Sequence, residues 1–132
     1  MPRGRILVVD DEVSVRESVR LVLDQAGYEV IEAEDGARAM ETVQSGDNPS
    51  RLDAVILDLY MPKIHGQEVI FFLRSKFPAI PIIVLTGKPD VPDIIRSFDE
   101  GVVDFLVKPV HPDNLLASVA KAVQGRGRSP SQ

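Results

Sequence analysis

The sequence predicts an α/β fold in which a doubly wound, five-stranded parallel sheet is covered by five helices. Five short apolar runs of strand length recur along the chain, and the segments between them carry apolar residues at three- and four-residue steps. Strands joined by helix-length crossovers require a parallel sheet, and the right-handed crossover rule leaves few ways to wind it.

The first half of the chain is predicted to form three strands and two helices. Gly27 stands where the first helix stops, and the turn-forming segment 45–50 ends the second. The predicted strands are 5–9, 28–33 and 54–57, and the predicted helices are 12–26 and 37–43.

The second half of the chain also alternates strands with helices. The predicted strands are 82–85 and 102–107, and the predicted helices are 66–77, 92–100 and 112–123. His65 and His111 precede two of these helices and are interpreted as surface or cap residues. We expect one domain over residues 4–124, followed by a flexible tail or linker at 125–132, which has no large apolar residue.

The composition restricts the class of protein. A chain of 132 residues with 44% apolar and 27% charged residues is typical of a single soluble domain. No apolar run is long enough for a membrane span or a secretory signal, so a cytoplasmic location is expected. The absence of cysteine excludes disulfides and thiolate chemistry, and the net charge of −5 gives no general attraction to nucleic acid.

Five polar residues stand at the carboxyl ends of predicted strands. In a parallel sheet these ends lie together at one edge, which is where ligands bind. The five residues are Asp10, Asp11, Asp58, Thr86 and Lys108. Three converging carboxylates would repel each other, which predicts a hard cation, and Mg²⁺ is the natural one. Asp58 is the candidate nucleophile that forms an aspartyl phosphate, with Lys108 and Thr86 binding the phosphoryl oxygens.

Each of these residues also has a structural interpretation. Asp10 and Asp11 could cap the first helix, Asp58 could cap a turn, Thr86 before Gly87 could belong to a turn, and Lys108 could be a solvated charge. The joint occurrence at one edge favours the functional interpretation, because the structural one needs a separate explanation for each residue.

Several motifs, in this order, resemble the receiver domain of two-component response regulators. They are Asp10-Asp11, Asp58-Leu-Tyr-Met-Pro with Gly66, Thr86-Gly87, and Phe105-Leu-Val-Lys108-Pro109. The resemblance spans residues 4 to 124 and implies the flavodoxin-like strand order 2-1-3-4-5. It also implies a phosphoacceptor signalling domain, not an enzyme acting on external substrates.

The resemblance assigns the metal ligands and the phosphoacceptor. Asp58 would accept the phosphoryl group, and both Asp11 and Asp58 would bind Mg²⁺ directly. Asp10 would act through water, and the backbone carbonyl of Tyr60 would complete the protein ligands.

The resemblance also implies a switch. Thr86 would move toward the phosphoryl group while Phe105 turns inward, which reshapes the surface of the predicted helix 92–100, strand 102–107 and helix 112–123. Tyr60 and Lys88 would border the attacking water and adjust the phosphoryl lifetime. The implied partners are a histidine kinase or phosphotransfer protein, an output domain or effector, and a second copy bound through that surface. The cognate kinase, the output and the presence of further domains stay open.

Two other classes of function are less consistent with the residues. A phosphohydrolase with an aspartate nucleophile usually has an acid two residues after it, where this chain has Tyr60. A nucleotide or flavin module would need a glycine-rich phosphate loop, whereas the first strand here leads into Asp10, Asp11 and Glu12.

Overall fold

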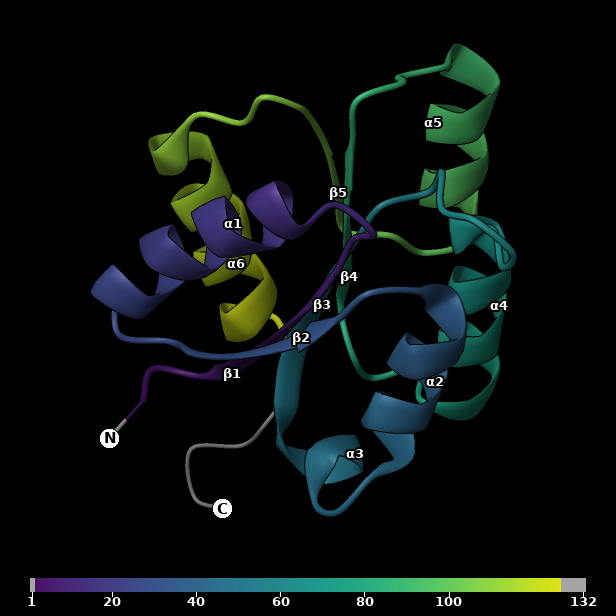
Figure 1. Ribbon diagram of the computed structural model, residues 1–132. Coiled ribbons are helices and arrows are strands. Elements are labelled where there is room, and N and C mark those ends of the chain that lie inside the picture. Colours follow the sequence, from purple (N-terminus) through teal and green to yellow (C-terminus); the bar gives the residue numbers. More distant parts are fainter. Residues whose placement is uncertain (1, 127–132) are drawn as a thin grey trace.

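A five-stranded parallel sheet forms the centre of the computed structural model, which describes residues 2–126 (Figure 1). The strand order is β2-β1-β3-β4-β5, and every neighbouring pair is parallel. The strands are β1 (Arg5–Val9), β2 (Glu29–Ala33), β3 (Leu52–Leu57), β4 (Ile82–Thr86) and β5 (Asp104–Val107). The predicted fold class and strand order are confirmed.

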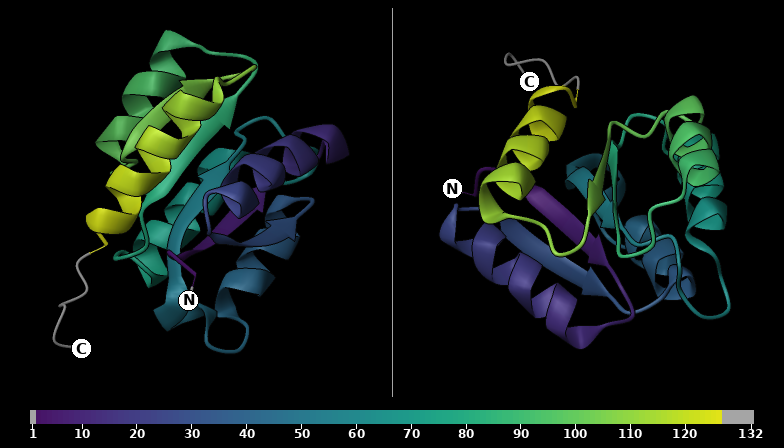
Figure 2. Two further views of the ribbon diagram at one scale, coloured as in Figure 1. Left: turned by 90° about the vertical axis from the view of Figure 1, so that its left-hand side faces the viewer. Right: turned by 90° about the horizontal axis from the view of Figure 1, so that it is seen from above.

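Helices cover both faces of the sheet, as Figure 2 shows from above. The helices are α1 (Val13–Gln25), α2 (Gly36–Gln44), α3 (Asn48–Arg51), α4 (Gly66–Lys76), α5 (Val91–Asp99) and α6 (Pro112–Gln124). Helices α1 and α6 lie on one side, and α2, α4 and α5 lie on the other (Figures 1 and 2). Within residues 2–126, no helix is long and apolar enough to cross a membrane.

The central strands are apolar on both faces and supply two separate cores. In β3, Val55 and Leu57 join the cluster under α2 and α4, while Ala54 and Ile56 join the cluster under α1 and α6. All six residues of β3 are buried. Because successive side chains of a strand point to opposite faces and both faces are covered, the sequence of such a strand shows a continuous apolar run.

Two strands start two residues away from their predicted starts, and the other predicted bounds differ by at most one residue. Strand β3 begins at Leu52 rather than at residue 54, because the buried Asp53 carboxylate accepts the backbone N–H of Arg5 on β1 at 2.8 Å. Strand β5 begins at Asp104 rather than at residue 102, because the Val102 N–H bonds to the Ser97 carbonyl and closes the end of α5.

The segment 45–50, predicted to be a turn, contains the start of a sixth helix. Helix α3 forms a single turn over Asn48–Arg51, with Pro49 in its first turn, where the missing N–H of proline is tolerated. The Asn48 side chain is buried and donates to the Thr42 carbonyl at 2.8 Å. The turn-forming composition did not indicate this short helix, which a hydrogen bond joins to the preceding helix α2.

Both histidines cap helices, as predicted. The His65 imidazole accepts the N–H of Gln67 at the start of α4, and the His111 imidazole accepts the N–H of Asp113 at the start of α6, each at 3.1 Å. The tail from residue 127 onward lies outside the described residues.

Candidate functional site

Asp10 and Asp58 meet because their strands are neighbours in register. Val9 on β1 pairs with Leu57 on β3, so the residues that follow leave the sheet side by side. The Asp58 N–H also donates to the Val9 carbonyl at 3.1 Å. Both aspartates are enclosed, with exposed fractions of 2% for Asp10 and 5% for Asp58. The pairing of two buried strands thus places two carboxylates in one small space.

Asp11 and Glu12 complete a four-residue acidic cluster. Each of Asp10, Asp11, Glu12 and Asp58 offers one carboxylate oxygen, and these oxygens all lie within 4.8 Å of one another. Asp11 and Glu12 are exposed, so the cluster opens to solvent on their side. Glu12 was not among the candidate site residues from the sequence, although its place directly after Asp10-Asp11 was a signal that could have included it.

Lys108 follows the edge strand β5 and reaches the acidic cluster across the end of β4. Thr86 on β4 pairs with Val107 on β5, and the Lys108 N–H donates to the Thr86 carbonyl at 2.8 Å. The Lys108 ammonium lies 2.7 Å from Asp10 Oδ2, 3.2 Å from Asp58 Oδ2 and 3.4 Å from Glu12 Oε1. One cation therefore faces three carboxylates, as expected from the sequence for Asp10 and Asp58.

The pKa values of Asp10 and Lys108 shift for different reasons. Burial raises the pKa of Asp10, and the hydrogen bond and charge of Lys108 only partly oppose this. For Lys108, burial acts to lower the pKa, but the bond to Asp10 and the charges of Asp10 and Asp58 outweigh it, so the pKa is raised. The pKa values of both groups are therefore raised. The Lys108 cation has several carboxylate partners, whereas Asp10 shares its one cation with the other carboxylates. The cluster keeps an excess of negative charge.

That donor set fits Mg²⁺. Magnesium binds oxygen ligands, usually one or two carboxylates together with water and phosphate oxygens. The cluster offers only oxygen donors, carries more negative charge than Lys108 neutralises, and has an open side at Asp11 and Glu12. The acidic cluster is thus consistent with the predicted magnesium site. The individual ligands, including the Tyr60 carbonyl, stay predictions.

Thr86 and Phe105 lie near the same edge but outside the acidic cluster. Thr86 is fully buried, and its hydroxyl oxygen accepts the N–H of Lys88 at 3.2 Å. Phe105 is half-buried and packs against the core under α2 and α4. The Thr86 hydroxyl is therefore engaged within its own loop, and Phe105 lies in an intermediate environment between core and solvent.

The loop after β3 turns back sharply behind Asp58. The Tyr60 N–H donates to Asp58 Oδ1 at 3.1 Å, and the Gly66 N–H donates to the Leu59 carbonyl at 2.8 Å. A Cβ at position 66 would lie 2.5 Å from Leu59 Cα and 2.6 Å from the Asp58 carbonyl oxygen, which no real side chain tolerates. Gly66 therefore allows the close approach of backbones that holds Asp58 in place.

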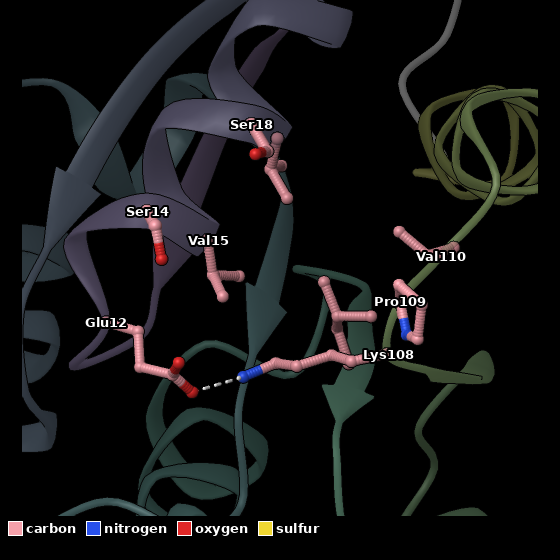
Figure 3. A pocket seen from close by; sticks show the side chains of 9 residues that line it. Glu12, Ser14, Val15, Ser18, Lys108, Pro109 and Val110 are labelled. Atoms are coloured by element: carbon pink, nitrogen blue, oxygen red, sulfur yellow. Dashed lines mark hydrogen bonds and ion pairs between the residues drawn. The ribbon is translucent and has the colours of Figure 1, made fainter.

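A groove opens beside the acidic cluster (Figure 3). It has a volume of about 460 Å³ and lies between the start of α1 and the segment after β5. Figure 3 shows Glu12 and Lys108 bonded across one end, with Val15, Pro109 and Val110 along its walls. The acidic cluster therefore borders a groove that is charged at one end, at Glu12 and Lys108, and has apolar residues along its walls.

Comparison with known proteins gives the family. Residues 6–120 match the model of the response regulator receiver domain. The chain belongs to this family. Receiver domains are phosphoacceptor modules of two-component response regulators and not classical enzymes, which agrees with the sequence-based expectation.

Relatives and solved structures extend this result. The receiver domain is 45% identical over 113 residues to the response regulator MprA of Mycolicibacterium vanbaalenii, covering 86% of this chain and 47% of that protein. The chain thus spans about half the length of such curated relatives. It is 34% identical to a response regulator receiver protein from Pseudomonas putida, with a TM-score of 0.84, covering 92% of this chain and 98% of that one. It is 37% identical to the response regulator TrrA of Thermotoga maritima in complex with Mg(2+)-BeF, with a TM-score of 0.79, covering 90% and 98%.

Proposed function

We propose that this receiver domain accepts a phosphoryl group on Asp58, in a Mg²⁺-dependent reaction, from a histidine kinase or a phosphotransfer protein. The observation that carries the proposal is the position of the Asp58 carboxylate. It lies within the acidic cluster and within 3.2 Å of the Lys108 ammonium, so it has a cation partner for phosphoryl oxygens next to a site suited to Mg²⁺. Family membership supports a histidine kinase as the class of donor.

The two oxygens of the Asp58 carboxylate have different partners, which orient the carboxylate for this reaction. Oδ1 accepts the Tyr60 N–H, and Oδ2 faces Lys108. In the proposed transfer, one Asp58 oxygen forms a bond to phosphorus as the bond from phosphorus to the donor nitrogen breaks, and the electron pair stays on that nitrogen. Lys108 then binds a phosphoryl oxygen in place of part of its present carboxylate contacts.

Mg²⁺ would be held by Asp10, Asp11, Asp58 and the Tyr60 carbonyl, with Glu12 as a further oxygen donor beside them. The ion supplies neutralisation of charge on the transferring phosphoryl group. The solved TrrA complex contains Mg(2+)-BeF, which supports a magnesium site in this family.

The proposed response to phosphorylation uses Thr86 and Phe105. A phosphoryl group adds negative charge and several acceptor oxygens at Asp58, so the Thr86 hydroxyl would exchange the Lys88 N–H for a phosphoryl oxygen. The half-buried Phe105 would then turn inward and change the surface of α5, β5 and α6. Phe105 lies on β5, the edge strand of the sheet, where such a change disturbs few neighbours.

That surface is the proposed site for an output domain, an effector or a second copy of the chain. It exposes large apolar side chains from α5 and the β5 segment, which mark an interaction site. They are Val91, Ile95, Phe98, Val103 and Val107. Light scattering with and without beryllofluoride tests dimerisation: a mass that doubles only with beryllofluoride is expected, and an unchanged monomer contradicts the dimer.

We place the receiver domain at residues 4–124, with the following residues as a tail or linker, and propose a cytoplasmic location. This domain is proposed not to contact nucleic acid or a membrane directly, since its net charge is −5.

Intact mass after incubation with Mg²⁺ and acetyl phosphate tests the proposal. The wild-type domain is expected to gain one phosphoryl group, and Asp58→Asn none. A matched control is Asp53→Asn, another buried aspartate of the same strand region that lies at the opposite end of β3. It should still be labelled if it folds. Full labelling of Asp58→Asn would assign the acceptor to another residue.

A further inference from the structure

Helix α5 is held near the acidic cluster by two side-chain hydrogen bonds from the segment that follows Asp58. The Tyr60 hydroxyl donates to the Asp93 carboxylate, and Gln67 Nε2 donates to Ser97 Oγ at 3.3 Å. Ser97 is the one α5 residue that is fully enclosed, whereas Val91, Ile95 and Phe98 are exposed. These two hydrogen bonds therefore connect α5 to the segment after Asp58, and one of them ends on the only fully buried side chain of the helix.

The Tyr60 side chain is fixed on several sides. Its backbone N–H bonds to Asp58, its ring packs edge-on against His65 at 5.3 Å between centroids, and the Lys88 ammonium lies 5.8 Å from the ring centroid. The phenol ring thus connects the loops after β3 and β4, which both border Asp58, with Asp93 on α5.

The Tyr60 hydroxyl also responds to the charge of this region. The pKa of Tyr60 is raised to about 12, first by the hydrogen bond to Asp93, then by burial and by the charges of Asp93, Asp90 and Asp58. The phenol therefore stays protonated and remains a donor to Asp93 at neutral pH.

We propose that Asp93 is a positioning residue for the phosphoryl site: by accepting the Tyr60 hydroxyl it holds the phenol ring and the adjoining Lys88 at the rim beside Asp58, and so slows hydrolysis of the aspartyl phosphate. The inference rests on phosphorylation of Asp58. In the hydrolysis, a water oxygen bonds to phosphorus while the bond from phosphorus to the Asp58 oxygen breaks. The electron pair stays on the Asp58 carboxylate, the proton of water passes to solvent, and orthophosphate leaves.

The physical reason is the direction of attack. In-line displacement requires water to approach phosphorus from the side opposite the Asp58 oxygen. The resemblance to receiver domains implies that Tyr60 and Lys88 border this approach. A Tyr60 ring held at both its backbone and its hydroxyl leaves less room for water than a ring held only at its backbone. Loss of the Asp93 contact should therefore free the ring and admit water.

The test compares the decay of the phosphorylated domain in a set of variants. Each protein is phosphorylated with Mg²⁺ and acetyl phosphate, the donor is removed by rapid gel filtration, and the remaining phosphoprotein is followed by intact mass. The rate for Asp93→Ala is expected to rise roughly threefold to tenfold, the factor that corresponds to one lost hydrogen bond. Asp93→Asn, whose side-chain carbonyl still accepts the Tyr60 proton, should decay close to the wild-type rate.

Two further variants separate positioning from a general structural effect. In a Tyr60→Phe background the Asp93→Ala substitution should have no additional effect, because the hydroxyl is already absent. Asp99→Ala removes an exposed acid at the other end of α5 and should leave the decay rate unchanged.

Three results would overturn the inference while leaving Asp58 phosphorylation intact. They are an unchanged decay rate in Asp93→Ala, an equally fast decay in Asp93→Asn, and an Asp93→Ala effect that persists in full without the Tyr60 hydroxyl. Failure of the wild-type domain to take up any phosphoryl group would instead overturn the proposed function itself, and the inference with it.

Discussion

Strands β3 and β5 each deliver a reactive residue to the same edge of the sheet, yet they are packed very differently. Strand β3, which leads to Asp58, is buried along its whole length. Strand β5, which leads to Lys108, has three half-buried residues and one exposed residue, and its neighbour α5 exposes several apolar side chains. The proposed acceptor Asp58 thus follows a firmly packed central strand, while the Lys108 amine follows a loosely packed edge strand.

This difference separates two roles that a switch must combine. A nucleophile works best on a rigid element, since its geometry must not vary. Elements that change conformation come from the less stable part of a fold, with few buried apolar contacts. In this domain the buried strand β3 and the edge strand β5 are linked by Lys108, which contacts Asp10 and Asp58. A change at Asp58 can therefore reach β5.

Matched truncations should show the largest difference between the two regions. Ile56→Ala on β3 removes a side chain that is 1% exposed, and we expect it to lower the free energy of unfolding by about 2–5 kcal/mol. Ile95→Ala on α5 truncates a side chain that is 55% exposed, and we expect a change within about 0.5 kcal/mol. Urea unfolding measures both. Equal losses at the two positions would remove the contrast between centre and edge.

Substitution of Gly66 should have the next largest effect. Gly66→Ala forces a methyl group into the Leu59 and Asp58 backbone, which we expect to lower the free energy of unfolding by about 1–3 kcal/mol and to slow phosphorylation, because Asp58 is displaced. Gly87→Ala is the control, since a Cβ there meets only the Lys108 side chain at 3.7 Å. Urea unfolding of both variants decides the point, and equal stability of the two would show that the backbone contact behind Asp58 has room for a side chain.

Asp10→Asn should have the smallest effect, and of opposite sign. Burial raises the pKa of Asp10, so the folded state binds this proton more tightly than the unfolded chain does, and wild-type stability falls as the pH rises through the folded pKa. Without Mg²⁺ at neutral pH the variant should therefore melt at a higher temperature than the wild type. The gain should disappear in acid, where the wild-type carboxyl is protonated.

Thermal unfolding across that pH range measures the effect, with Glu17→Gln as an exposed control acid on α1. Added Mg²⁺ should raise the melting temperature of the wild type more than that of Asp10→Asn, because the ion neutralises the same charge. A variant that is less stable than the wild type at neutral pH would mean that the bond from Asp10 to Lys108 outweighs its burial.

The sequence predicted the sheet and its order because the central strands are covered on both faces and therefore read as uninterrupted apolar runs. It predicted the convergence of Asp10, Asp11, Asp58 and Lys108 because strand ends in a parallel sheet lie together. Those predictions follow from local pattern and topology alone.

Other features depended on contacts that local pattern does not carry. The start of β3 at Leu52 includes a buried aspartate whose partner, Arg5, is distant in the sequence. Helix α3 lies in a segment of turn-forming composition and is held by Asn48. Asp93 could not be identified as a neighbour of Tyr60, because the first turn of an amphipathic helix commonly carries an acid whatever lies opposite it.

The position of the phosphoryl group tests the central claim most directly. After incubation with Mg²⁺ and acetyl phosphate, borohydride reduces an aspartyl phosphate to homoserine, and tandem mass spectrometry of the tryptic peptides 6–16 and 52–63 reads the modified residue. We expect homoserine at position 58, dependent on Mg²⁺ and lost in Asp58→Asn. Homoserine at Asp10, Asp11 or Asp53 instead, or a product that forms equally without Mg²⁺, would contradict a magnesium-assisted acceptor at the end of β3.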